Sequence, residues 1–181
     1  MYKPGFGKQK GSAFEREICK KLSLWVSSNE RDDLYWRSAM SGGRASVQFK
    51  KGKTNKTQVG DITAIDSEGE ILTNNWIIEC KTYQNLHIDS LFFGTPKSNS
   101  LLEYWDVLCK QCDIYKKAPI LIAKQNGKPI IILLDFEIVL HLHNFPTIQF
   151  KNMINNPIYI YFFDEIVEDI KFKAFLKCYG I

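Results

Sequence analysis

The sequence predicts one α/β domain, in which a central mixed β-sheet is flanked by helices. A length of 181 residues suits a single globular domain. The composition, 45% hydrophobic and 24% charged, is close to that of folded domains and supplies a core without a disulfide or a structural metal. The expected elements follow the order helix, strands, helix, strands, and this order packs naturally as a sheet with helices on its faces.

The first helix is expected from Ser12 to about Val26. Ser12 is a good N-cap residue, and apolar residues recur behind it at helical spacing. Ser12 and Glu15 also have the spacing of a capping box. A short strand is expected over residues 34–37, and residues 50–57 are expected to form a basic loop or the tip of a hairpin.

Two further strands and a second helix are expected in the middle of the chain. The strands cover residues 59–65 and 75–83, with a turn at 67–70 between them. The helix begins with the capping-box pattern of residues 100–103 and runs to about Lys117.

The remaining elements are short strands and a last helix. The β-branched runs 120–123 and 130–134 are separated by Asn-Gly at 126–127, a strong hairpin signal. A strand is expected near 158–163 and a helix near 165–178.

Positive charge is concentrated in the first third of the chain. Residues 1–60 carry thirteen Lys/Arg and five Asp/Glu, or 13 − 5 = +8, whereas residues 61–181 carry eleven and fifteen, or 11 − 15 = −4. This asymmetry favours a polyanionic partner, with a solvated basic face as the alternative.

Several features point to a cytoplasmic protein. No stretch is long and apolar enough to cross a membrane, and the basic N-terminus has no apolar run of a secretory signal. Five cysteines at irregular spacing fit a reducing compartment. Cys109 and Cys112 form a lone C-x-x-C, interpreted as buried thiols rather than as half of a zinc site.

The strand expected at residues 75–83 carries the residues suited to catalysis. Alternate side chains of a strand share a face, so one face is apolar and the other combines a carboxylate with an ammonium group. The apolar face contains Trp76, Ile78 and Cys80, and the other contains Ile77, Glu79 and Lys81. A carboxylate on a buried strand is costly unless it is paired, and a metal ion or a phosphate would pair with this face.

Asp61, on the preceding strand, is expected to meet Glu79 across a hairpin. Two adjacent carboxylates repel each other, and a divalent cation removes the repulsion. Carboxylate ligands favour Mg²⁺ or Mn²⁺ over zinc. Such an ion polarises a phosphoryl oxygen and activates a bound water, while Lys81 can orient the water or neutralise developing charge.

These motifs resemble those of a known nuclease superfamily. Gly60-Asp61 followed by Glu79-Cys80-Lys81 resembles the motif of the PD-(D/E)XK, or restriction endonuclease-like, nucleases. Within that superfamily, three segments resemble the archaeal-type Holliday junction resolvases: Lys10 to Glu17 their opening helix, Arg37 to Gly42 their R-S-A-G-S segment, and Ile78 to Lys81 their I-E-V-K. The similarity covers about residues 10–124.

The resemblance implies a restriction endonuclease-like fold. It also implies a homodimeric DNA endonuclease of recombination or repair that cuts branched DNA. The implied cofactor is Mg²⁺, with Mn²⁺ able to replace it. Residues 1–181 are interpreted as one nuclease domain with a core of about 10–135 and a C-terminal extension, 136–181. The implied catalytic residues are Glu15, Ser41, Asp61, Glu79 and Lys81, of which Glu15, Asp61 and Glu79 are expected metal ligands. Gln111 is a possible match to a glutamine of the wider superfamily. The expected DNA contacts are Arg37, Arg44, Lys50, Lys51, Lys53 and Lys56.

The sequence departs from the resolvase pattern in three places. Gly60 occupies the position of the motif's proline, residues 44–58 resemble an insertion, and the tail after about Phe136 has no recognised counterpart.

The sequence also allows other interpretations. The enzyme could be a restriction or repair nuclease acting on other DNA, or the chain could be a DNA-binding module without catalytic activity. Glu15 could cap the first helix, Asp61 could be a turn residue, and Glu79 with Lys81 could be a surface ion pair. Trp36 and Trp76 are interpreted as core residues.

Overall fold

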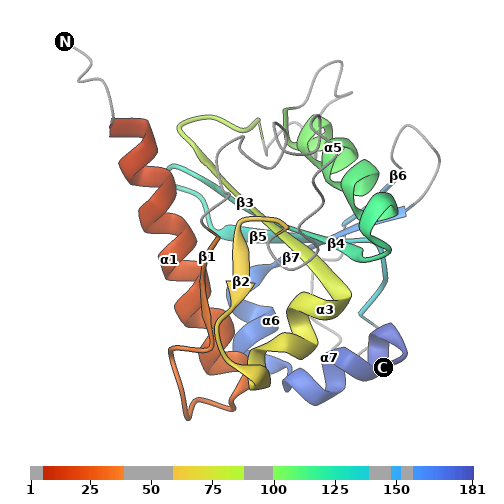
Figure 1. The fold of residues 1–181 in the computed structure, drawn as a ribbon. Helices are drawn as coiled ribbons and strands as arrows, with labels where there is room; N and C mark the ends of the chain where they lie inside the picture. The colour runs from red at the N-terminus through yellow and green to blue at the C-terminus, as the bar shows by residue number, and fades with distance from the viewer. Residues whose placement is uncertain (1–5, 39–58, 88–99, 139–147, 152–156) are drawn as a thin grey trace.

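A five-stranded mixed sheet forms the centre of the computed structural model, which describes residues 6–38, 59–87, 100–138, 148–151 and 157–181. The strand order is β3-β4-β5-β7-β6, and only the β3–β4 pair is parallel. The strands are β3 (Trp76–Tyr83), β4 (Ala118–Gln125), β5 (Ile130–Leu134), β6 (Ile148–Lys151) and β7 (Pro157–Phe162). Because β3 is an edge strand, its outer side is open to other parts of the chain (Figure 1).

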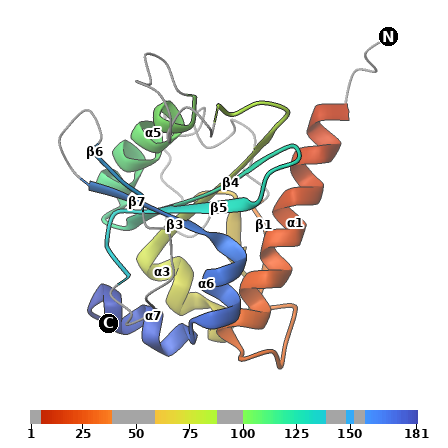
Figure 2. The same ribbon diagram turned by 180° about the vertical axis from the view of Figure 1, so that it is seen from behind.

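Helices cover both faces of the sheet. One face packs against α1 (Phe6–Val26), α3 (Glu70–Asn75), α6 (Phe163–Asp169) and α7 (Phe172–Tyr179), and Figure 2 shows α6 beside α1. The other face is covered by α5 (Ser100–Tyr115). The central strands β4 and β5 are apolar along nearly their whole length, as expected for strands buried on both faces.

A two-stranded antiparallel ribbon lies next to α1, formed by β1 (Tyr35–Arg37) and β2 (Ile62–Ala64). One face of the ribbon packs into the core through Tyr35 and Ile62. The short 3₁₀ helix η1 (Ser67–Gly69) then leads into α3, and α3 leads directly into β3.

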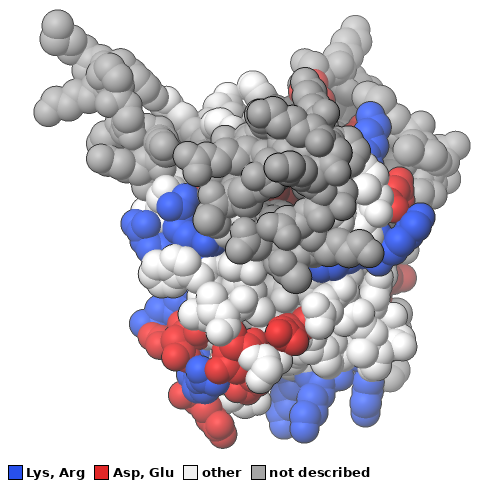
Figure 3. All heavy atoms as spheres, in the orientation of Figure 1, with Lys and Arg blue, Asp and Glu red and all other residues white. Residues whose placement is uncertain are grey.

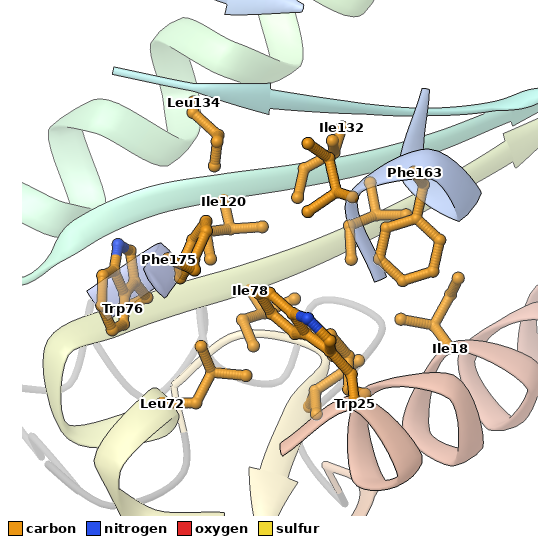
Figure 4. Close-up of a cluster of buried hydrophobic side chains, with 14 of the residues drawn as sticks. Ile18, Trp25, Leu72, Trp76, Ile78, Ile120, Ile132, Leu134, Phe163 and Phe175 are labelled. Atoms are coloured by element: carbon orange, nitrogen blue, oxygen red, sulfur yellow. The ribbon is translucent and has the colours of Figure 1, made fainter. Parts of the chain in front are cut away.

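The core between the sheet and α1 is closed by the C-terminal residues. In Figure 4, Trp25 lies among side chains of several elements, and its ring packs edge-on against Phe172 at 5.0 Å and Phe175 at 4.9 Å between centroids. The Trp25 indole N–H donates to the carbonyl oxygen of Ile170 at 2.6 Å. The segment after residue 136 therefore supplies both sheet strands and core side chains.

The predicted fold class is confirmed, and four local predictions need correction. Ser12 is not an N-cap, because α1 already begins at Phe6. The strand expected over 59–65 is only Ile62–Ala64, and residues 70–75, expected to end a turn and begin a strand, form α3. Finally, the last helix is broken at Ile170, whose extended backbone places its side chain in the core and its carbonyl against Trp25.

None of the helices in the described parts of the chain has both the length and the apolar character needed to cross a bilayer.

Candidate active site

Asp61 is fixed against the edge of β3 by backbone hydrogen bonds on both sides. Its N–H donates to the carbonyl of Ile78 at 2.8 Å, and its own carbonyl accepts from the N–H of Ser38 at 2.7 Å. The carboxylate accepts from the N–H of Cys80 at 2.9 Å. Asp61 is consequently only 6% exposed. It is buried against the edge of β3 and is not a solvated turn residue.

Asp61 and Glu79 both lie beside Lys81, although the chain between them is not a hairpin. The chain between them forms η1 and α3, and Asp61 reaches β3 just before β2 begins.

Gly60 makes this approach possible. Its φ angle is +87°, and a Cβ atom on this residue would lie 2.7 Å from the carbonyl oxygen of Ile78. A proline, which fixes φ near −65°, cannot adopt this conformation. The backbone therefore explains why glycine stands where the related motif has proline.

Replacing Gly60 by alanine is expected to destabilise the protein by about 3 kcal/mol, since the strained φ and the contact with a backbone oxygen both add cost. Gly127→Ala is the matched control: Gly127 has φ +72° but open space around its Cβ position, so only the conformational cost of about 1 kcal/mol applies. Urea denaturation of both variants measures the difference. Equal losses would show that the approach of Gly60 to Ile78 does not matter.

Glu79 and Lys81 project from the same face of β3, and Lys81 joins the two carboxylates. The Lys81 ammonium bonds to Glu79 and lies 3.9 Å from Oδ2 of Asp61. The exposed fractions of the side chains are 20% for Lys81, 9% for Asp61 and 23% for Glu79. These values do not fit the alternative of a solvent-exposed ion pair on a strand surface.

The electrostatics of this cluster favour a further positive charge. Burial, together with the charges of Glu79 and Glu15, raises the pKa of Asp61 to about 7, although Lys81 and the Cys80 N–H act in the opposite direction. Burial alone would lower the pKa of Lys81, but Glu79 and Asp61 outweigh it and raise that pKa. One ammonium group therefore does not balance the carboxylates at this edge.

Glu15 lies next to the cluster on α1 and is paired with Arg37. The Arg37 Nε donates to Glu15 at 2.8 Å, and the side chains are 30% and 13% exposed. Because Ser12 lies inside α1, Glu15 does not belong to a capping box. Arg37, expected to contact DNA, is turned toward Glu15.

The oxygen donors of Asp61 and Glu79 suit a hard divalent cation. Within the ranges that the structure describes, no three Asp, Glu, His or Cys side chains form a ready-made metal cage. Mg²⁺, however, is usually held by only one or two protein carboxylates, together with waters and substrate phosphates. The mutual repulsion of the carboxylates and the raised pKa of Asp61 fit such a site, with Glu15 nearby.

Six expected site residues lie outside the described residues: Ser41, Arg44, Lys50, Lys51, Lys53 and Lys56. Gln111 lies on α5, and none of the contacts described for this structure joins it to Glu79 or Lys81.

Aromatic residues near the site differ from expectation. Trp76 is a core residue at 1% exposed, as predicted, but the prediction for Trp36 is wrong, since it is 53% exposed. Trp36 pairs with Thr63 on the outer face of the ribbon, opposite to the face that packs on the core. Tyr104, which the sequence did not single out, has its ring 5.4 Å from the Lys81 ammonium.

The C-x-x-C cysteines belong to the core between α5 and the sheet. Cys112 is buried and Cys109 is half-buried, and burial raises the pKa of both thiols to about 12.

Comparison with known protein families gives a match over most of the chain. The family model described as "Phage putative PDDEXK endonuclease" matches residues 7–177. No curated protein and no solved structure matches the chain. The family match includes Asp61, Glu79 and Lys81, and it continues through the C-terminal strands and helices that complete the sheet and core.

Proposed function

Because the chain belongs to this phage PDDEXK endonuclease family, we propose that it is a divalent-metal-dependent DNA endonuclease with Asp61, Glu79 and Lys81 in its active site. The mixed sheet with flanking helices fits a nuclease of this type. The observation that carries the proposal is the convergence of the three side chains at one sheet edge, where Lys81 bonds to Glu79 and lies 3.9 Å from Asp61.

Each residue of the cluster has a distinct role in this proposal. Asp61 and Glu79 would hold the cation, with Glu15 as a further ligand. When bound, the cation supplies Lewis-acid polarisation of a phosphoryl oxygen and lowers the pKa of a water molecule. With Glu79 engaged as a ligand, the Lys81 ammonium would be free to hydrogen-bond the attacking water or a phosphate oxygen. A fixed cation aimed at the reacting phosphate stabilises the charge that develops in the transition state.

The charge distribution supports an approach of DNA from one end of the β1–β2 ribbon. At the far end of the ribbon from Asp61, Arg31 is surrounded by the carboxylates of Asp33, Asp66 and Glu68. Figure 3 shows acidic side chains gathered at the lower left of the molecule. A polyanion is repelled by such a region, so the Asp61 end of the ribbon is the favourable side.

The resemblance of residues 10–17 and 37–42 to junction resolvases supports a finer proposal. The substrate is branched DNA such as a four-way junction, the cation is Mg²⁺ with Mn²⁺ as a substitute, and the active form is a homodimer.

A cleavage panel in Mg²⁺ buffer tests this proposal with duplex, single-stranded, flap and four-way-junction DNA of matched sequence. We expect the junction to be cut at least tenfold faster than the duplex. Equal cutting of all four substrates would contradict the preference for branched DNA. Binding without cleavage of any substrate would instead show a DNA-binding module without activity.

A further inference from the structure

The face of β3 that carries Glu79 and Lys81 continues to Tyr83 and is joined by an aromatic residue of α5. Residues 79, 81 and 83 alternate along β3 and so share one face. The Tyr83 and Tyr104 rings stack at 5.8 Å between centroids and 7° between planes. The Lys81 ammonium lies over the Tyr104 ring, 5.4 Å from its centroid.

Tyr104 is held in this place by the packing of α5. Its neighbours Leu101, Trp105 and Leu108 are 0%, 1% and 2% exposed and anchor the helix on the sheet. The stacking of its ring on that of Tyr83 also holds the two side chains side by side. Tyr83 is 45% exposed, so the aromatic pair reaches the protein surface beside Lys81.

Lys81 needs a further contact, such as the Tyr104 ring, once Glu79 binds the cation. Its flexible four-carbon stem is costly to hold in one geometry. Its strongest partner is Glu79, the residue that the proposed function assigns to the cation. A ring face attracts an ammonium group electrostatically, and it remains available when the carboxylates turn to a cation.

We propose that Tyr104 is a positioning residue, whose ring holds the Lys81 ammonium in its catalytic place while Tyr83 supports that ring. This inference rests on the proposed function, since it deepens the role of Lys81 in the same site. Tyr104 acts through Lys81 and does not itself contact the reacting atoms.

Removing the ring is expected to affect turnover rather than binding. Tyr104→Leu should lower kcat about 5- to 30-fold and leave KM within about twofold, as expected for a cation–π contact at a partly desolvated site. Tyr104→Phe keeps the ring face and should cleave within about twofold of wild type. Tyr115→Leu, the same change at the other end of α5, is the matched control and should leave kcat unchanged.

A spectroscopic measurement tests the contact without depending on cleavage. In ¹³C-lysine-labelled protein, the Lys81 ε-methylene resonance, assigned by its absence in Lys81→Ala, should be shifted upfield by the Tyr104 ring. Tyr104→Leu should remove the shift, and Tyr104→Phe and Tyr115→Leu should keep it.

The two measurements separate failure of this inference from failure of the proposed function. If the wild type cuts no DNA, the proposed function fails, and the resonance still decides whether Tyr104 holds Lys81. Wild-type cleavage by Tyr104→Leu overturns the inference, as does an unchanged resonance in that variant. An equal loss of turnover in Tyr104→Phe would also overturn it, because the ring face would then not be what matters.

Discussion

Lys81→Ala is expected to lower the cleavage rate 10²- to 10³-fold while leaving the fold and most of the DNA affinity intact. Lys81 is one of 24 Lys and Arg residues, so its loss removes little of the total attraction to phosphate. In the transition state its contribution is larger, because a preorganised charge in a water-poor site is worth about 3–4 kcal/mol. Single-turnover cleavage and gel retention of the same DNA measure the two effects separately.

Two controls sharpen this prediction. Lys124→Ala removes a lysine on the neighbouring strand β4, where Lys124 pairs with Glu17 at 3.3 Å, and it should leave cleavage nearly unchanged. Excess Mn²⁺ should not rescue Lys81→Ala, because an ammonium group is not a metal ligand. If Lys81→Ala cuts as fast as wild type, the interpretation of Glu79-Cys80-Lys81 as a catalytic motif is wrong.

Asp61→Asn is expected to abolish cleavage and, at the same time, to stabilise the metal-free protein at alkaline pH. The pKa of Asp61 is about 7 in the folded protein, and an unfolded aspartate titrates near 4. The folded state therefore binds the proton more tightly, so the stability that this residue contributes is present at low pH and is lost as the pH rises through about 7. At pH 8 the wild type carries a buried carboxylate, whereas asparagine is neutral and still accepts from the Cys80 N–H.

The expected gain for Asp61→Asn at pH 8 is about 2–4 kcal/mol, and it should shrink toward zero near pH 4. Thermal melts in EDTA across this pH range measure it. Asp66→Asn is the control, with an expected effect of opposite sign. A hydrogen bond from the Glu68 N–H and another from Arg31 lower the pKa of Asp66. The Asp66→Asn variant should therefore lose stability at pH 8. If the difference in stability between Asp61→Asn and wild type is the same at every pH, the buried charge of Asp61 is not the cause of that difference. Excess Mn²⁺ should partly restore cleavage by Asp61→Asn, since Glu79 remains as a ligand.

The centre of the site was predictable because strand alternation is a strict rule. Once residues 76–83 are recognised as a strand, Glu79 and Lys81 must lie on the same face of it. In the structure, the two faces of β3 do contact separate core clusters. Asp61 was predicted to reach Glu79 across a hairpin, but the chain between them is not a hairpin. Nothing local shows that a helix, α3, intervenes and that Gly60 turns Asp61 onto the strand edge through a positive φ.

Other parts depended on contacts between segments that are distant in the sequence. The spacing of Ser12 and Glu15 left a helix cap open as an alternative for Glu15, and its pairing with Arg37 and its charge effect on Asp61 place it near the site. Tyr104 was not singled out, since no local pattern indicates that Lys81 will lie over its ring. The break at Ile170 is likewise set by tertiary packing, because its carbonyl accepts from Trp25.

The dependence of wild-type cleavage on Mg²⁺ tests the central claim most directly. The protein is first freed of metal with EDTA and then titrated with Mg²⁺. Wild-type protein should leave four-way-junction DNA intact before Mg²⁺ is added and should cut it as the ion concentration rises. Asp61→Asn should leave the DNA intact at the same Mg²⁺ concentrations. DNA that stays intact with wild-type protein at every Mg²⁺ and Mn²⁺ concentration, or that is cut equally fast in EDTA, would contradict a metal-dependent nuclease built on Asp61 and Glu79.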